Sequence, residues 1–495
     1  MLGAGFPSSG AVHGSAIKEL PSSIGSLPFL KDLLAGNCRS LGKLPDSIEG
    51  LASVVELQLD QTPITNLPNQ VAALKMLRKL EMRNCKDLRS LLESIGSMFS
   101  LTSLNISNSN ISKLPESIGM LENLVIFRLN KCTQLRKLPD SIGNLKSLHH
   151  LLMEETAVTE LPERFGMLSS LMILKMAKKP HFLSAGNRIP EEDLVAENKR
   201  NIILSEFHLH SQIYATLKNW MLVLGIYVLK SLPPLPSSLV EVNVANCTAL
   251  ERVSNISKLE SLRELNLTNC EKVEDIPGLE CLKSLTRLFM SGCKACSSVV
   301  KRRFSKVSLR NLRSLSMPGN EIPAWFSQEV RFSERKNHDI KGVIIGVVVS
   351  LYPQIHDDLR DQLPALPCVR ANIVKLNKLL FSTMPELKGV PKTNEDHIYL
   401  FRYSDCHQNL SDGDDINVRE QDPPYIKGIE VKKCGLYLIF EGDEESLDKS
   451  QLFVSEKLAK FFSSVEDEDH TSELLNINPK CEYECEIVLY SCPIN

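Results

Sequence analysis

The sequence has no long hydrophobic run and almost no net charge. Its longest apolar stretches, residues 220–229 and 343–351, are too short to cross a bilayer. The formal net charge is -3 over 495 residues, so we predict no broad basic face and therefore neither nucleic-acid nor membrane binding. The first fifteen residues lack the basic start and apolar run of a signal peptide. We expect an intracellular protein, cytoplasmic or, as an alternative, nuclear.

Motifs for catalysis and for cofactors are also missing. The chain contains no Gly-x-x-x-x-Gly-Lys-Ser/Thr phosphate loop. Its paired carboxylates, such as Asp357-Asp358, are common surface pairs, and no nucleophile stands beside an arranged base. Cys293-x-x-Cys296 has no second ligand pair with finger spacing. We expect no enzyme activity, no cofactor and no metal.

The chain does contain a regular repeat. A Leu-Pro pair, or Leu-Leu once, recurs at steps that alternate between 24 and 23 residues. A period of this size is typical of leucine-rich repeats, in which each strand-plus-connector unit shares its core with its neighbours. The sequence therefore predicts an α/β leucine-rich-repeat solenoid. The pairs begin at Leu20, Leu44, Leu67, Leu91, Leu114, Leu138 and Leu161.

A small polar residue follows each predicted strand. Cysteines occupy this slot in the long repeats and hydroxyl residues occupy it in the short ones. We expect these side chains to bond backbone carbonyls of the next coil, because buried backbone groups need partners. The cysteines should therefore serve packing. The slot holds Cys38, Thr62, Cys85, Ser109, Cys132 and Thr156, and later Cys247, Cys270 and Cys293.

The repeat pattern also predicts the domain boundaries. Residues 1–16 read as an irregular start with a truncated repeat, and residues 17–177 as a first repeat segment. The rhythm fails over 178–230 and resumes over 231–317. The break is either a functional insertion or sequence foreign to the repeat, such as a retained intron or decayed repeats. We favour the second explanation because the register resumes at once. Residues 318–495 form a further domain.

Residues between the leucines of each strand should point to the concave face, because side chains alternate across a strand. We expect this face to bind a protein partner through a few energetically dominant positions. Phe289 is the best single anchor, although it could equally pack against the following domain. The candidates are Glu56, Gln58, Asp60, Lys79, Glu81, Arg83, Asn105, Arg128, Asn130, His150, Glu154, Lys175, Glu241, Asn243, Glu264, Asn266, Arg287 and Phe289.

After Met317 the pattern changes to runs rich in Val, Ile and Tyr. These runs predict an antiparallel all-β sandwich. Trp325 and Phe326, beside a Pro-Gly turn, should cover the apolar end of the solenoid, which would otherwise be exposed. The expected strands span residues 340–351, 397–403, 425–431, 435–440 and 485–489.

Three motifs of this region carry a family resemblance. The run from Pro318 to Phe326, the run Asp396-His-Ile-Tyr-Leu-Phe-Arg-Tyr and the run from Val431 to Phe440 resemble the post-repeat jelly-roll or Ig-like domain of plant intracellular disease-resistance receptors. That class has a Toll/interleukin-receptor-like amino-terminal domain, and its repeats also carry Leu-Pro-x-Ser-Ile-Gly-x-Leu. The motif and capping residues are Pro318, Gly319, Glu321, Ile322, Pro323, Trp325, Phe326, Cys434 and Gly435.

The resemblance implies pathogen sensing in plant defence. In such receptors this region binds a pathogen effector or a guarded host protein, and it restrains the receptor's own nucleotide-binding domain when unbound. Nothing in this chain resembles the nucleotide-binding or NAD-cleaving domains, so we expect neither activity. Two alternatives stay open. The chain could be a stand-alone cytoplasmic scaffold that binds a host signalling protein such as a small GTPase, or a non-functional fragment of a truncated receptor gene.

Overall fold

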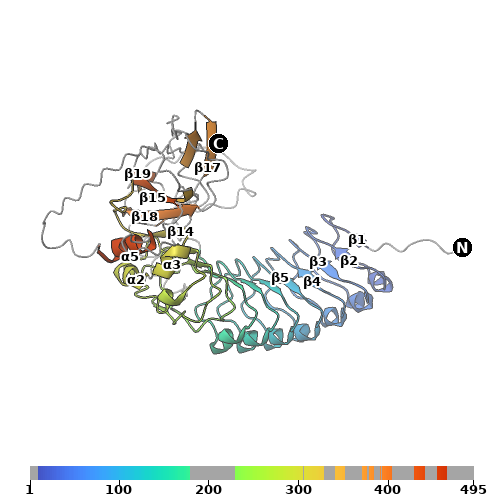
Figure 1. The fold of residues 1–495 in the computed structure, drawn as a ribbon. Helices are drawn as coiled ribbons and strands as arrows, with labels where there is room; N and C mark the ends of the chain where they lie inside the picture. Colours follow the sequence, from blue (N-terminus) through green and yellow to red (C-terminus); the bar gives the residue numbers. More distant parts are fainter. Residues whose placement is uncertain are drawn as a thin grey trace, which may run out of the picture.

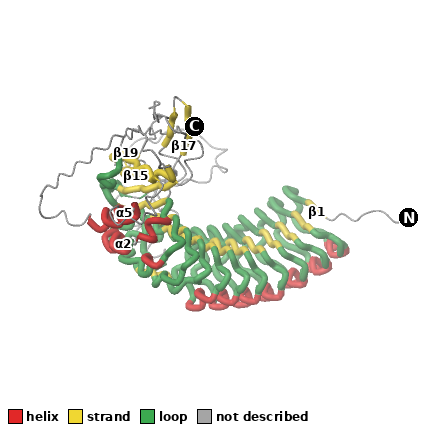
Figure 2. The backbone as a smooth tube through the Cα atoms, in the orientation of Figure 1, coloured by secondary structure: helices red, strands yellow, loops and turns green. Residues whose placement is uncertain are grey.

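The computed structural model describes residues 9–178, 229–304, 306–327, 340–351, 371–375, 378–383, 391, 393–403, 429–440 and 454–464. Its repeats form an arch with strands on the inner edge and helical turns on the outer edge (Figures 1 and 2). The strands are β1 (Ser9–Ala11), β2 (Asp32–Leu34), β3 (Glu56–Gln58), β4 (Lys79–Glu81), β5 (Ser103–Asn105), β6 (Ile126–Arg128), β7 (His150–Leu152), β8 (Ile173–Lys175), β10 (Glu241–Asn243), β12 (Glu264–Asn266), β13 (Arg287–Phe289) and β14 (Ser314–Pro318).

All of these strands pair in parallel with their neighbours, one strand per repeat. The solenoid that the leucine period predicts is therefore present. Strand β1, within the segment 1–16 that reads as an irregular start with a truncated repeat, pairs with β2. Small β9 (Ser231–Leu232) and β11 (Arg252–Val253) form a separate parallel pair in the connectors of the second segment.

Short 3-10 helices lie on the convex side; η1 to η7 each start after the second residue of the Leu-Pro or Leu-Leu pair, and η8 starts after Gly278. In most of them a glycine lies close to a neighbouring turn, whereas η3 has Ala72 at the equivalent position. A Cβ on Gly119 would lie 2.3 Å from the carbonyl oxygen of Ser141, so only glycine fits there. The helices are η1 (Ser22–Ser26), η2 (Asp46–Gly50), η3 (Asn69–Ala73), η4 (Glu93–Ser97), η5 (Glu116–Met120), η6 (Asp140–Asn144), η7 (Glu163–Met167) and η8 (Leu279–Cys281).

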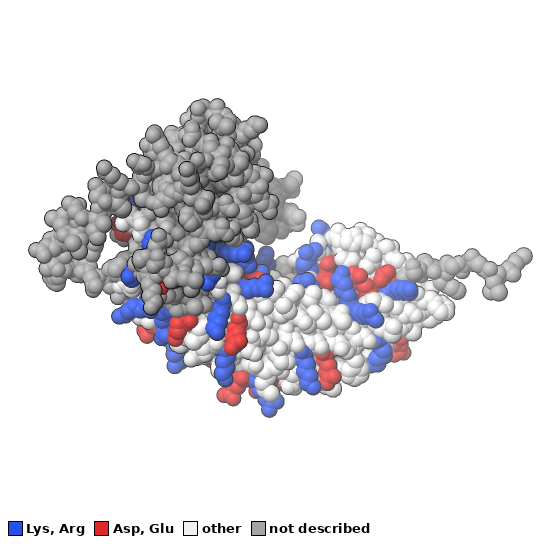
Figure 3. Space-filling model, viewed as in Figure 1, with Lys and Arg blue, Asp and Glu red and all other residues white. Residues whose placement is uncertain are grey.

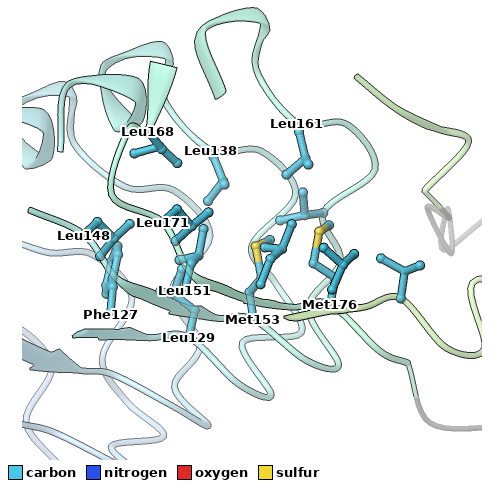
Figure 4. Packing of buried hydrophobic residues seen from close by; sticks show 14 of the residues in the cluster. Phe127, Leu129, Leu138, Leu148, Leu151, Met153, Leu161, Leu168, Leu171 and Met176 are labelled. Atoms are coloured by element: carbon cyan, nitrogen blue, oxygen red, sulfur yellow. The ribbon is translucent and has the colours of Figure 1, made fainter. Parts of the chain in front are cut away.

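The core lies between the strands and the helical turns. From η2 to η7 the repeats contribute the first leucine of the Leu-Pro or Leu-Leu pair, an apolar helix residue and the inward strand residues, and these side chains are almost completely buried. Figure 4 shows Phe127, Leu151 and Leu171 from successive repeats packed in contact layers, with Met153 and Met176 beside them. A single repeat could not bury this apolar surface alone, which explains why similar repeats follow one another along the sheet.

The slot after each strand holds a hydrogen-bonded side chain, but its partner differs from the expected one. The Sγ atom of Cys85 donates to the carbonyl oxygen of Leu59, 3.1 Å away in the preceding coil, and not to the next coil. Thr62 donates to the same oxygen over 2.7 Å from within its own coil. One carbonyl thus accepts both side chains. Ser109 and Cys132 repeat the arrangement.

The break in the rhythm does not interrupt the sheet. Strand β8 pairs directly with β10, and the amide of Lys178 donates to the carbonyl of Ala245 over 2.9 Å. Leu229 is buried 12 residues before β10, as Leu161 is buried 12 residues before β8. Lys178 and Leu229 thus occupy consecutive places in one repeat of the described solenoid, in register with the repeat before it. Residues 179–228, to which both explanations of the break refer, lie outside the described residues.

Beyond the repeats the same sheet continues with antiparallel strands. Its order after β14 is β18 (His397–Tyr403), β15 (Ile340–Leu351) and β19 (Ile429–Phe440). The first two match the expected strands. The described part of the expected strands 425–431 and 435–440, residues 429–440, is one strand, β19, with a register shift opposite Val348 and Val349. The hairpin β16 (Ala371–Lys375) and β17 (Lys378–Thr383) is separate, and 485–489 lies outside the described residues.

Several elements of the post-repeat region cover the end of the solenoid. Strand β18 pairs along β14, and helices α2 (Ser297–Arg303), α3 (Lys306–Asn311) and α5 (Val454–Ser464) cover the neighbouring core. Phe304 of the solenoid end meets Phe462 of α5, with ring centroids 5.1 Å apart. Trp325 and Phe326 pack against Tyr437 of β19, and Phe326 is buried in the same core. The pairing of β18 with β14 closes the end of the solenoid, because the backbone groups at the edge of β14 gain hydrogen-bond partners and the apolar surface beside them is covered.

Candidate functional site: the concave face

The concave face carries the polar strand residues in aligned rows. Parallel pairing without a shift places Glu56, Lys79 and Ser103 in one row and Gln58, Glu81 and Asn105 in the next. Each row runs across the strands, so that side chains from neighbouring repeats lie next to one another. The strand positions that the sequence predicts for this face do occupy it, but their exposure varies from exposed to fully buried.

Ion pairs and hydrogen bonds join the first rows. The ammonium of Lys79 lies 2.8 Å from a carboxylate oxygen of Glu56 and 3.9 Å from one of Glu81, and the hydrogen bond to Glu56 raises its pKa. Asn105 donates to Glu81 over 2.8 Å. Asp60, only 7% exposed, accepts from the backbone amide of Arg83. Most of these polar groups already have partners within the chain.

The centre of the face is less polar than the sequence analysis expected. Ile126, Leu152 and Ile173 occupy concave positions of β6, β7 and β8 and are half-buried. The sequence prediction named mainly polar residues on this face and did not include these three. Their positions indicate the concave face all the same, because they flank the inward-pointing residue of each strand. They alternate with Arg128 and His150, so apolar and basic side chains share the centre.

The titratable residues of the centre are affected by burial. Burial, followed by the charges of His149 and Arg128, lowers the pKa of His150, which is therefore neutral at pH 7. Burial also raises the pKa of Glu154. The amide of Asn130 donates to Glu154 over 3.3 Å, and the Asn130 oxygen accepts from the backbone of Glu154 over 3.0 Å.

Towards the post-repeat sheet the face becomes buried. Lys175 pairs with Glu241 over 2.9 Å, and Arg287 with Glu264 over 2.5 Å. Glu264 and Asn266 are below 9% exposed. Phe289, left open as an anchor or a packing residue, is 3% exposed and so offers no surface to a partner. Asn243, on β10, is half-buried at the edge of the open part.

The residues of the family motif lie together on the outer part of the sheet. A Cβ on Gly435 would lie 2.9 Å from both Ile322 and Phe326, so glycine lets the 318–327 segment lie flat on β19. Ser327 and Leu436 exchange two backbone hydrogen bonds of 3.0 and 2.9 Å. Glu321 forms an ion pair with Lys433, and Trp325 packs against Tyr437. The backbone amide of Gly319 donates to the carbonyl of Asp396, and that of Phe326 donates to the carbonyl of Pro323. Pro318 pairs opposite His397 and Cys434 opposite Val347 in the sheet.

Charge over the repeats is mixed. Figure 3 shows basic and acidic side chains interspersed on the visible face, without a field of one sign. Among the described residues, no group of three or more His, Cys, Asp and Glu is placed to hold a metal ion. Cys293 and Cys296 are both buried, and Cys293 donates to the carbonyl of Leu267 over 3.0 Å. No helix within the described ranges is long and apolar enough to span a membrane.

Comparisons identify the repeats. Residues 70–185 match the family model of a leucine-rich repeat region, so the chain contains such a region. Similar solved structures include the leucine-rich repeat domain of the type III effector XopL (19% identity, 55% of this chain and 73% of that one, TM-score 0.34). Others are a repeat protein of Leptospira interrogans (18%, 57% and 83%, 0.28) and an internalin of Listeria monocytogenes (17%, 63% and 87%, 0.34). No curated protein matches the sequence.

Proposed function

We propose that the chain recognises a protein partner on the concave face of strands β2–β10. The observation that carries this proposal is the aligned set of side chains from adjacent strands on one curved sheet. A rigid sheet presents these groups with little loss of conformational entropy on binding, and the mixture of polar and apolar groups suits a protein interface. We propose a binding role without catalysis, cofactor or metal.

The partner that we propose is a pathogen effector or a guarded host protein, in the defence signalling of a plant cell. The post-repeat region supports this proposal, because the motifs that carry the resemblance pack against one another at Gly435, Phe326 and Ser327. In a complete receptor of that class, this region would also restrain the receptor's own nucleotide-binding domain. We place the protein in the cytoplasm, with the nucleus as an alternative.

A pairwise interaction screen tests the proposal. The whole chain is co-expressed with a panel of secreted effector proteins from plant pathogens and, separately, with a panel of host signalling proteins. The test variant is Arg83→Glu combined with Arg128→Glu, both on the concave face. The matched control is Lys146→Glu, which reverses one exposed charge on the convex side.

We expect an effector, or a host protein that such an effector modifies, to bind the wild type and the control but not the double variant. Partners that depend on Lys146 and ignore the double variant would contradict concave-face recognition. A concave-face partner found only among host signalling proteins would favour the scaffold alternative.

A further inference from the structure

The centre of the concave face is a compact checkerboard of six side chains. Strands β6, β7 and β8 align Ile126 with His150 and Ile173 in one row, and Arg128 with Leu152 and Lys175 in the other. All six are half-buried. Adjacent strands are about 4.8 Å apart and alternate residues about 7 Å apart, so the checkerboard covers roughly 10 by 7 Å. This area fits two or three side chains of an extended segment.

The checkerboard differs from the rest of the open face in its apolar content. The corresponding positions of β3, β4, β5 and β10 are all polar or charged, and β2 contributes one aliphatic residue, Leu34. Only here do three aliphatic side chains lie on neighbouring strands at concave positions of the described solenoid. Aliphatic groups that are half-buried in the free protein can be covered completely by a partner, and such central apolar contacts dominate interface energetics.

One basic residue at the centre of the face, Arg128, has no acidic partner among the described residues. Four basic residues lie within the concave strands, and three of them pair with a carboxylate: Lys79 with Glu56, Lys175 with Glu241 and Arg287 with Glu264. Arg128 makes only a long hydrogen bond, 3.5 Å to the hydroxyl of Ser103, and no ion pair with any described residue. A guanidinium between aliphatic side chains binds a carboxylate strongly, because both N–H groups can bond it in a water-poor site.

We propose that this checkerboard takes an extended segment of a protein partner that carries an acidic side chain beside aliphatic ones. The carboxylate binds Arg128, and its neighbours cover Ile126, Leu152 and Ile173. This inference rests on the proposed concave-face recognition and specifies the chemistry of its partner. The uncompensated positive charge makes an acidic segment the complementary occupant.

His150 supplies an independent readout. The charged groups around it are His149 on its own strand, Arg128 on β6, Lys175 on β8 and Glu241 on β10. Burial and the three basic neighbours keep it neutral in the free protein. A carboxylate bound at Arg128 would favour the protonated ring, so binding should take up a proton. Affinity for an acidic segment should therefore increase as the pH falls from 8 to 6.

The experiment selects binders from a phage-displayed library of random 12-residue peptides on the whole chain. We expect the selected peptides to share Asp or Glu next to Leu, Ile or Val. Synthetic copies are then titrated against Arg128→Glu, against Arg83→Glu on the same face outside the checkerboard, and against Lys146→Glu on the convex side. Unfolding midpoints check that each variant is folded.

Arg128→Glu should weaken the synthetic peptides by about 10-fold or more, because it replaces an attraction by a repulsion. Lys146→Glu should change affinity by less than about 3-fold, since exposed charges outside a contact contribute little. Arg83→Glu, on the same face but outside the checkerboard, should weaken the peptides less than Arg128→Glu does. The increase in affinity at pH 6 should disappear in His150→Gln.

Two outcomes would overturn the inference, and they separate it from the proposed function. Peptides that lose binding on Arg83→Glu but not on Arg128→Glu would leave concave-face recognition standing and remove the checkerboard as its centre. Peptides without acidic enrichment that ignore both concave variants and depend on Lys146 would contradict both proposals.

Discussion

The backbone amide of Gly292 donates a hydrogen bond to the Nε2 atom of His397, 2.9 Å away. Gly292 ends the strand region of a repeat, and His397 begins β18, so this bond joins the solenoid to the post-repeat sheet. The opposite ring nitrogen, Nδ1, lies 2.8 Å from the carbonyl oxygen of Glu395 and can only donate to it. The ring must therefore be neutral, with its proton on Nδ1.

The stability of this joint should depend on pH through His397. Burial lowers its pKa from 6.5 to about 4. Between these two values the unfolded chain binds the extra proton and the folded chain does not, so stability increases with pH. The contribution is complete above pH 6.5 and is lost as the pH falls towards 4. We expect a loss of about 2 kcal/mol between pH 7 and pH 5.

Urea unfolding at pH 5, 6, 7 and 8 measures this loss. The His397→Gln variant is the control, because a glutamine oxygen can still accept from Gly292 but does not titrate. The difference between wild type and variant should carry the pH dependence and remove the contribution of the other histidines. Parallel profiles for the two proteins would refute the assignment to His397.

Removing residues 318–495 should make the solenoid aggregate. The deletion removes β18, β15, β19 and α5, which leaves the remaining residues of β14 as an open edge and uncovers Leu315 and Met317. An open parallel edge with an apolar face beside it promotes association of copies. Size-exclusion chromatography with light scattering detects the aggregates. A soluble, monomeric deletion variant with unchanged unfolding would show that β14 needs no cover.

Gly119→Ala should destabilise the convex stack. The added methyl group would lie 2.3 Å from the carbonyl oxygen of Ser141, which belongs to the backbone of the next helical turn and cannot rotate away. We expect a cost of about 1–3 kcal/mol. Gly42→Ala is the matched control, because nothing lies within 4 Å of its Cβ position. Thermal unfolding gives the midpoints of both variants. Equal midpoints would mean that neighbouring coils can move apart to accommodate the methyl group without loss of stability.

The sequence predicts the repeat fold well because its signal is periodic and local. The step between Leu-Pro pairs determines which leucines are buried, and strands β15 and β18 have the bounds that their Val- and Ile-rich runs indicate. The two runs that form β19 read as separate strands, with Lys432, Lys433 and Cys434 between them and Gly435 at the start of the second run. In the structure this glycine is inside the strand, where it makes room for Phe326.

The candidate site was only partly predictable because exposure depends on distant parts of the chain. Phe289 has the sequence position of a concave anchor, yet it is buried at the end of the solenoid where the post-repeat sheet begins. Glu264 is likewise buried beside Arg287. The sequence prediction also left out three aliphatic residues of the face, Ile126, Leu152 and Ile173, because it considered mainly polar residues at these positions. Repeat spacing alone cannot show which of these positions a neighbouring domain covers.

The solenoid should tolerate replacement of residues 179–228 by a normal turn. In the preceding repeat, the five residues 156–160 connect Glu155 to Leu161. Lys178 and Leu229 occupy the positions equivalent to Glu155 and Leu161 in the next repeat. Strands β8 and β10 already pair without these residues. We expect a chimera with the sequence of 156–160 in their place to unfold at a midpoint no lower than the wild type, since a shorter connection costs less chain entropy.

Circular dichroism during heating gives the two midpoints. Adding Leu229→Ala to the chimera is the control for register: it should cost about 2–5 kcal/mol, because Leu229 is fully buried where Leu161 lies one repeat earlier. A chimera that aggregates would mean that residues 179–228 contribute to the folded solenoid, and would favour a functional insertion. A stable chimera whose partner binding is unchanged would favour sequence foreign to the repeat, because the recognition surface would then be complete without it.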